Sequence, residues 1–127
     1  MKREILFKAK REDNDEWVEG FYVCISGTKH YILTGNPVIS PHNVDIELYK
    51  IIPETVGQFT GWCDKNGVKI FKGDIVRAYK NNEVLFTEVI AFRNGCFWFG
   101  NWNWIEFLNM FRNIEVIGNI HDITEEE

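Results

Sequence analysis

Two aspartates and an asparagine in the segment DKNGVKIFKGDIVRAYK are the side chains best suited to hold a cation. Asp64, Asn66 and Asp74 supply oxygen atoms of the kind that calcium prefers. The DKNG portion resembles half of a calcium loop, but a third acidic ligand before the glycine and a distant glutamate are missing. The alternative is turn formation, because Gly67 and Gly73 accept positive φ and aspartates in turns accept hydrogen bonds from backbone N–H groups. We predict two tight turns and no metal site.

The histidines and cysteines are spaced too widely to predict a catalytic centre; they are His30, His42, His121, Cys24, Cys63 and Cys96. No CxxC pair occurs, which excludes a zinc ribbon or a thioredoxin-like motif at the sequence level. The His121-Asp122 pair has no serine or cysteine nucleophile beside it, although assembly in space stays open. Scattered single thiols are typical of a reducing cytoplasm. We expect no catalytic residue, no metal and no cofactor.

The stretch FWFGNWNW, residues 97–104, is the most suggestive candidate for a binding site. If its central Gly-Asn pair forms a hairpin turn, Trp98 and either Trp102 or Trp104 stand side by side on one face. An exposed pair would form a stacking platform for single-stranded nucleic acid or an apolar patch for a protein. We favour a third interpretation, in which most of these rings fill the core of a small barrel. A strand buries only one face in a barrel, so the other rings need cover from the N-terminal residues or from a second copy of the chain.

Basic side chains gather at the start of the chain, at Lys2, Arg3, Lys8, Lys10 and Arg11. On a strand, Lys8 and Lys10 share a face opposite Phe7 and Ala9, and such a face can contact phosphate. We favour instead the solvated outer face of an edge strand, where lysine discourages the addition of another strand. The chain as a whole carries a net charge of −5 and therefore does not attract a phosphate backbone.

These side chains must be positioned by a chain of 127 residues that is 45% hydrophobic and 15% aromatic. Few prolines and many glycines, β-branched and aromatic residues favour short strands joined by tight turns. In the first half, alternation predicts strands at residues 4–9, 17–25, 30–34 and 45–52, with a long loop at 35–44. In the second half, strands are predicted at 58–62, 69–71, 75–79, 84–92, 96–99, 102–105 and 114–120, with a helical turn at 106–112. Asn94-Gly95 is a strong hairpin signal.

The fold class that follows is mainly β. We predict a small N-terminal β subdomain, residues 1–54, packed on a C-terminal SH3-like barrel, residues 55–123, with an acidic tail at residues 124–127. The two turns near residues 66 and 73 aim Ile70, Phe71, Ile75 and Val76 into one core. No signal peptide and no run of about 20 apolar residues is present, so we expect a cytoplasmic protein without a membrane partner.

Two segments resemble the signature segments of the YopX family: TVGQFTGWCDKNGVKIFKGDIV, residues 55–76, and IEVIGNIHD, residues 114–122. The opening, KREILFKA followed by EWVEGFYV, is also similar to the start of that family. The family is encoded mainly in bacteriophage and prophage genomes. The resemblance implies an N-terminal β subdomain followed by an SH3-like barrel, and it implies no catalytic residues. The chain departs from the family at Lys10, where an aromatic is common, and in its final residues, 123–127.

The function predicted from these observations is that of a phage or prophage accessory protein of the bacterial host's cytoplasm. It would be a non-enzymatic binding module that acts through protein–protein contacts and self-association, because the chain has more aromatics than one small barrel can bury. The alternative is a single-stranded nucleic-acid-binding β domain that uses Trp98, Trp102, Trp104 and the basic N-terminal strand. An enzyme is the least supported hypothesis, and no small-molecule substrate or cofactor is inferred.

Overall fold

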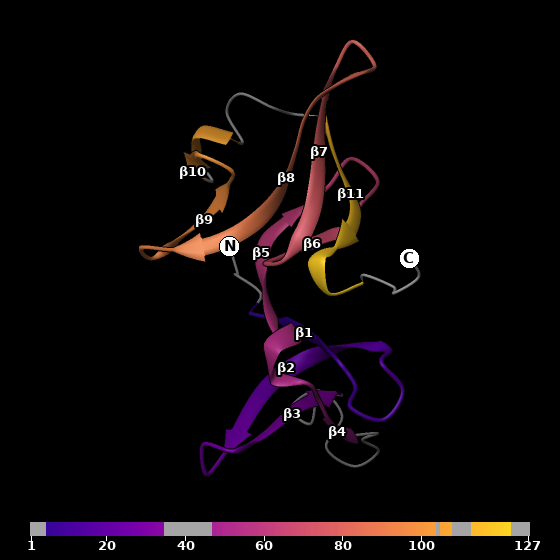
Figure 1. Cartoon of the computed structure of the whole chain (residues 1–127), viewed down its shortest axis with the longest axis vertical. Coiled ribbons are helices and arrows are strands. Elements are labelled where there is room, and N and C mark those ends of the chain that lie inside the picture. Colours follow the sequence, from indigo (N-terminus) through magenta and orange to yellow (C-terminus); the bar gives the residue numbers. More distant parts are fainter. Residues whose placement is uncertain (1–4, 35–46, 104, 108–112, 123–127) are drawn as a thin grey trace. The chain divides into compact units, whose positions relative to one another are not determined.

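The computed structural model describes residues 5–34, 47–103, 105–107 and 113–122. The chain divides into two compact units, Met1–Phe59 and Thr60–Glu127. The described part of both units is mainly β, as the composition predicts (Figure 1). The division falls inside strand β5 (Gly57–Cys63), whereas the boundary expected from the sequence lies after residue 54.

The N-terminal unit is an antiparallel sheet in the order β4-β3-β2-β1-β5, and β5 continues into the second unit to pair with β6 (Lys69–Phe71). Its strands are β1 (Phe7–Lys10), β2 (Trp17–Ile25), β3 (Lys29–Thr34), β4 (Glu47–Lys50) and the start of β5, which follows a short 3-10 turn, η1 (Pro53–Thr55). Ser26 and Gly27 have φ values of 56° and 72°. This left-handed backbone reverses the chain tightly between the paired residues Ile25 and Lys29.

One face of this sheet holds the core of the N-terminal unit. Strand alternation buries Ala9 and Ile32 fully, and Ile51 joins them, with half-buried Phe7, Val18, Tyr22 and Val56 packed around. The first strand, predicted at residues 4–9, begins at Phe7, and Ile5 before it is 57% exposed. The expectation that this strand lies at an edge is wrong, since β1 pairs with β2 on one side and with β5 on the other.

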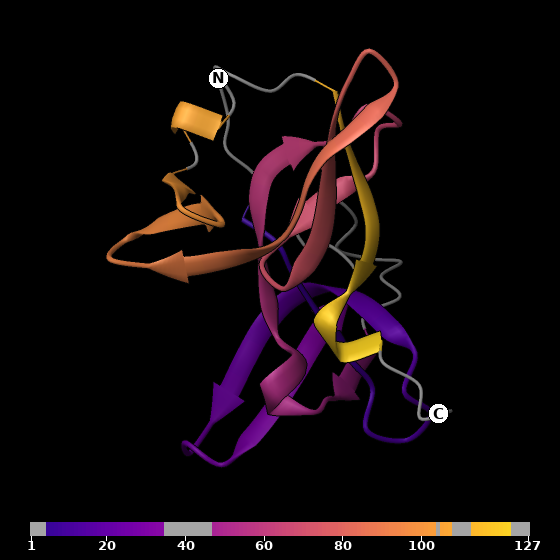
Figure 2. The ribbon, with the colours of Figure 1, turned by 45° about the horizontal axis from the view of Figure 1, so that its top comes forward.

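The C-terminal unit holds a second antiparallel sheet in the order β10-β9-β8-β7-β11 (Figure 2). Its strands are β7 (Asp74–Lys80), β8 (Glu83–Arg93), β9 (Cys96–Phe99), β10 (Trp102–Asn103) and β11 (Ile114–Asn119), followed by a 3-10 turn, η2 (Ile120–Asp122). Both hairpins turn between the predicted strands, at Asn81-Asn82 after residues 75–79 and at the predicted Asn94-Gly95, with φ between 54° and 79° at all four residues. Such turns match the twist of the strands that they join.

The core of the C-terminal unit is formed by apolar side chains that are spread along its sequence. They are Ile70, Val76, Ala78, Ile90, Phe97, Phe99, Phe107 and Ile114. The rings of Phe99 and Phe107 are fully buried and stack with centroids 4.1 Å apart. Burying one such side chain contributes roughly 1.5–3 kcal/mol. Of the four residues expected to share a core, Ile70 and Val76 do so. Phe71 is buried outside this cluster and Ile75 is only half-buried.

Several finer expectations are corrected or stay predictions. The strand expected at residues 102–105 ends at Asn103, and residues 105–107 are helical because Asn103 and Glu106 exchange side-chain-to-backbone hydrogen bonds at the helix start. Among the described strands, β10 and β11 are the outer strands of the second sheet, so closure into a barrel stays a prediction. The predicted loop 35–44, residues 108–112 of the predicted helical turn and the acidic tail lie outside the described residues. No helix in the described part is long and apolar enough to cross a membrane.

Candidate functional site

Two of the tryptophans proposed as a binding site, Trp98 and Trp102, lie on opposite faces of their hairpin. In the β9–β10 hairpin, Trp102 pairs with Phe99 and Trp98 pairs with Asn103. Directly paired residues point to the same face of a sheet. Trp102 therefore shares the face of Phe99 and packs, half-buried, against the core, whereas Trp98 points to the other face. The expected pairing of Trp98 with Trp102 is wrong, and Trp104 lies outside the described residues.

Trp98 is held in place by its own hairpin. Its indole Nε1 donates a hydrogen bond of 3.0 Å to the carbonyl oxygen of Arg93. The Arg93 guanidinium lies 4.5 Å from the ring centroid and also donates to the carbonyl oxygen of Gly100 at 3.2 Å. A cation–π contact at an exposed site contributes about 0.5–1 kcal/mol. A ligand that stacked on this face of the ring would first have to displace the guanidinium.

Asp64, the first of the predicted cation ligands, is a turn residue. Its side chain is only 7% exposed. Oδ1 accepts hydrogen bonds from the backbone N–H groups of Asn66 at 2.8 Å and Val68 at 2.9 Å, and Oδ2 accepts one from Val116 at 2.8 Å. The carboxylate thus closes the turn, in which Gly67 has a φ of 79°, and ties it to β11. The oxygen atoms that a cation would need are already engaged by N–H donors.

Asp74 plays a similar part at the second turn. It is 1% exposed, its Oδ2 accepts from the Phe71 backbone N–H at 2.8 Å, and its Oδ1 accepts from Nδ2 of Asn119 at 2.9 Å. Gly73 supplies the left-handed backbone that the turn needs, with a φ of 93°. Both turn predictions are confirmed. Among the described residues, no group of three His, Cys, Asp or Glu side chains is placed to hold a metal ion.

The fold brings one histidine and one cysteine together. Cys24 and His30 are cross-strand partners in the β2–β3 hairpin. Nδ1 of His30 lies 2.6 Å from the hydroxyl oxygen of Tyr22, and the two rings stack with centroids 5.9 Å apart. Burial, with a smaller contribution from the Cys24 thiol, raises the pKa of Tyr22 above its ordinary value, so the phenol is neutral at neutral pH. These contacts brace the hairpin, while His42 lies outside the described residues.

The two lysines of β1 lie over an aromatic ring. Lys8 and Lys10 share the face opposite Phe7 and Ala9, as predicted, because their strand partners are Glu19 and Trp17. Nζ of Lys8 lies 4.6 Å and Nζ of Lys10 lies 5.6 Å from the Trp17 ring centroid. Both distances fall within the range of about 6 Å for cation–π attraction. The basic strand and Trp17 thus form one cluster, a connection that sequence reasoning missed.

This cluster belongs to the face of the N-terminal sheet opposite its core, called here the outer face. The strand registers place twelve side chains on it: Lys8, Lys10, Trp17, Glu19, Phe21, Val23, Ile25, Lys29, Tyr31, Leu33, Leu48 and Lys50. Three of the large apolar ones are 44–50% exposed: Phe21, Ile25 and Leu48. Four lysines and one glutamate give this face a net charge of +3, against −5 for the whole chain.

Alternation along residues 17–25 does place Trp17, Phe21, Val23 and Ile25 on one side of the strand, as the sequence pattern predicts. The pattern could not show that this side faces away from the core. The opposite side of β2 is apolar as well, so either side satisfied the same alternation.

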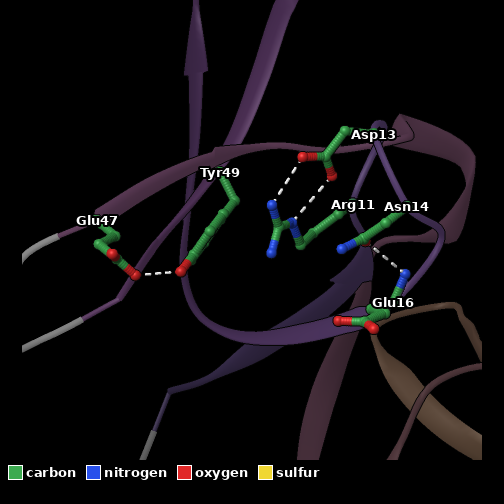
Figure 3. A network of polar contacts seen from close by, with 6 residues as sticks. All are labelled: Arg11, Asp13, Asn14, Glu16, Glu47 and Tyr49. Carbon is green, nitrogen blue, oxygen red and sulfur yellow. Dashed lines mark hydrogen bonds and ion pairs between the residues drawn. The ribbon is translucent and has the colours of Figure 1, made fainter.

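A shallow pocket of about 240 Å³ lies beside β4 and is lined by Arg11, Glu12, Asp13, Leu48, Tyr49 and Lys50. Its charged groups are paired with one another, Arg11 with Asp13 (Figure 3) and Lys50 with Glu12. The Arg11 guanidinium makes an ion pair of 2.7 Å with Asp13 and lies 4.4 Å from the Tyr49 ring centroid. The hydrogen bond from Arg11 lowers the pKa of Asp13, and the hydrogen bond of Tyr49 to Glu47 raises the pKa of Tyr49. A pocket whose charges already satisfy one another is a weak candidate for ligand binding.

The β7–β8 hairpin presents a run of exposed apolar residues in the C-terminal unit. The exposed fraction is 52% for Val84, 41% for Leu85, 40% for Phe86 and 36% for Val89. One edge of β8 pairs with β7 along this stretch, but β9 pairs with the other edge only at residues 90–93. Along residues 83–89 the described strand pairing of β8 is with β7, and the opposite edge of these residues is called here the arm edge.

Comparison with known proteins identifies the family of this chain. The family model described as YopX protein matches residues 6–125. The chain belongs to the YopX family. The match spans both units, which confirms the resemblance seen in the signature segments. No curated protein sequence matches the chain significantly.

A solved structure shows that other proteins share this architecture. The crystal structure of protein EF1440 from Enterococcus faecalis is similar to this YopX family protein, with a TM-score of 0.61 and 24% sequence identity. The similarity covers 95% of this chain and 96% of that chain. At this level of identity the likeness shows a common fold alone.

Proposed function

We propose that this YopX family protein is a non-enzymatic accessory module that acts through protein–protein contacts, with self-association first among them. The proposal includes a phage or prophage origin, supported by the genomes in which the family is mainly encoded. It also includes the cytoplasm of the bacterial host, supported by the three free cysteines. The C-terminal strands are taken as an SH3-like roll, supported by the run of antiparallel neighbours from β10 to β11.

The arm edge is the observation that carries the proposal. A strand edge offers alternating N–H and C=O groups to any strand that can lie beside it, and natural proteins commonly protect such edges with lysine or proline. Residues 83–89 contain neither of these, although the register with β7 shifts between Phe86 and Val84. Val84, Leu85 and Phe86 in succession are at least 40% exposed. Addition of a partner strand would pair the backbone groups of the arm edge and remove this apolar surface from water.

A second copy of the chain is the partner proposed for the arm edge. Two copies related by a twofold axis present the same edge to each other and pair in antiparallel order. Pairing centred on Phe86 places Glu83 opposite Val89 and Val84 opposite Glu88. A shift that placed Glu83 opposite Glu88 would set like charges against each other and is disfavoured. The register centred on Phe86 is therefore a symmetric arrangement that keeps the acidic residues of the two copies apart.

Light scattering during gel filtration tests this proposal. At high micromolar concentration we expect the wild-type protein to exceed the mass of a monomer. Val84→Lys should move it toward the monomer, because lysine on an edge strand opposes strand addition. Val68→Lys is the matched control, since Val68 is 47% exposed at the turn before β6. A wild-type protein that remains strictly monomeric at this concentration would overturn the proposal.

The alternative site for nucleic acid at Trp98, Trp102 and Trp104 loses support from the geometry. Trp102 packs on the core, and Arg93 lies over the ring of Trp98. Neither residue presents an open ring face beside the other. The pairing of Trp98 with Trp104 stays a prediction, because Trp104 lies outside the described residues.

A further inference from the structure

The outer face of the N-terminal sheet carries three aromatic rings on two adjacent strands. Trp17 and Phe21 come from β2, and Tyr31 comes from β3. Phe21 pairs with Leu33, and Tyr31 pairs with Val23, so Phe21 and Tyr31 occupy diagonal positions of one strand pair. Diagonal neighbours on a sheet lie roughly 7–8 Å apart. Two rings at that spacing on an open sheet can each receive one base of an extended single strand.

Positive charge surrounds these rings. Lys8 and Lys10 lie on the β1 side of the outer face, Lys50 lies on β4 opposite Tyr31, and Lys29 lies at the end of the β2–β3 hairpin. The ammonium groups of Lys8 and Lys10 both lie over the Trp17 ring. The ion pair of Lys50 with Glu12 spans 3.7 Å, and both side chains are more than half exposed. An exposed pair of this kind contributes little, so a phosphate can replace the glutamate at small cost.

Aromatic rings surrounded by lysines favour a polyanion with flat apolar groups over a protein partner. The face has a net charge of +3 on a chain of net charge −5, so its lysines are concentrated rather than scattered. A protein docking on the apolar centre would have to bring carboxylates to the surrounding lysines in addition to apolar side chains for the centre. Single-stranded nucleic acid neutralises those groups with phosphates and covers the rings with bases. A duplex keeps its bases stacked on one another and cannot offer them.

We propose that the outer face of the N-terminal sheet binds single-stranded nucleic acid. Bases stack on Phe21 and Tyr31, and phosphates lie against Lys10, Lys29 and Lys50. The half-buried Val23 and Leu33 form an apolar floor between the rings. The site is distinct from the arm edge of the proposed self-association.

Fluorescence polarisation with end-labelled oligo(dT) and oligo(U) at low salt tests the proposal. Phe21→Leu and Tyr31→Leu keep an apolar side chain but remove the ring, and each should weaken binding about 5- to 150-fold. Lys50→Gln should weaken binding as well. It should also make the slope of log affinity against log salt shallower by about 0.7, the value expected for one phosphate contact with a single strand. Lys72→Gln, an exposed lysine of the other unit, is the matched control and should change neither quantity.

The outcomes separate this proposal from its competitors. The proposal is supported if the wild-type protein binds either oligonucleotide and both ring variants bind it more weakly. Duplex DNA should compete poorly with the bound oligonucleotide. Binding that the ring variants retain, with polyglutamate competing as well as the oligonucleotide, would show a bare charge effect and overturn it. A fall in molecular mass in the ring variants without nucleic-acid binding would assign the outer face to a second copy and also overturn it. Val84→Lys should bind the oligonucleotides like the wild type, so self-association and nucleic-acid binding can fail independently.

Discussion

Replacement of Asp64 by alanine is the most direct test of the argument that the DKNG segment is a structural turn. The carboxylate accepts three hydrogen bonds from backbone N–H groups, two within its own turn and one from Val116 on β11. Alanine removes both acceptor oxygens, and with them all three hydrogen bonds, while leaving the backbone conformation of residue 64 available. Asparagine is the milder change, because its single oxygen can keep the two bonds within the turn but loses the bond to Val116.

The loss in the free energy of unfolding depends on what satisfies each N–H group once the Asp64 carboxylate is gone. A hydrogen bond to a charged group contributes about 1.5–3 kcal/mol, and bonds that share one carboxylate are not additive. Asn66 and Val68 are exposed, so water can satisfy their N–H groups, whereas Val116 is half-buried. We therefore expect Asp64→Ala to lower the free energy of unfolding by about 2–4 kcal/mol. We expect Asp64→Asn to lower it by about 1.5–3 kcal/mol, a large part of a typical total of about 5–15 kcal/mol.

Urea unfolding followed by tryptophan fluorescence measures the loss, and amide hydrogen exchange locates it. Exchange of the Val116 amide should accelerate in both Asp64 variants. Asn66→Ala is the control on the same turn, because it removes an exposed side chain but keeps the backbone N–H that bonds to Asp64. It should change the free energy of unfolding by less than about 1 kcal/mol.

Two results would refute the reasoning. One is an Asp64→Ala protein that loses less than about 1 kcal/mol and keeps the protection of its Val116 amide. The other is a rise in the unfolding midpoint of the wild type, but not of Asp64→Ala, when calcium is added. A ligand that binds only the folded state stabilises it by mass action, so this second pattern would identify a cation site.

Three further predictions concern the cores and a titrating phenol. Gly20→Ala should lower the thermal unfolding midpoint clearly more than Gly118→Ala, because a Cβ at residue 20 would meet the Leu33 carbonyl oxygen at 2.2 Å whereas one at residue 118 meets nothing within 4 Å; equal midpoints would contradict this packing. Phe99→Ala should cost about 3–5 kcal/mol in urea unfolding, since its buried ring stacks on Phe107, and a loss below about 1 kcal/mol would be inconsistent with that core. Ultraviolet titration should show a phenol that ionises above pH 10 and is absent in Tyr22→Phe; because the folded pKa is raised, the stability linked to Tyr22 is complete below pH 10 and falls as the pH rises further.

Local conformation was largely predictable from the sequence. Asn94-Gly95 and the turn at residues 80–83 needed only the low cost of positive φ at asparagine and glycine, and both hairpins form there. The prediction that Asp64 and Asp74 serve turns also rested on neighbouring N–H groups. Failures at this level were small, such as the strand expected to reach residue 105, where a local capping interaction starts a helix instead.

The candidate sites depended on which face of each strand the fold buries, and the sequence did not determine this. β2 is apolar on both sides, so its alternation was equally compatible with burial of Trp17 and Phe21 or of Val18 and Tyr22. Only pairing with β1 and β3 turned the first pair outward, beside the lysines.

The sequence also did not determine that Trp98 and Trp102 lie on opposite faces, because this follows from the pairing of Trp102 with Phe99. Nor did it show the hydrogen bond between Asp64 and Val116, which are 52 residues apart. By itself, the sequence determined where the chain turns and where it extends, because φ preferences and alternation act over a few neighbouring residues. The tertiary structure alone decided which surfaces remain open to a partner, because burial depends on contacts between residues far apart in the chain.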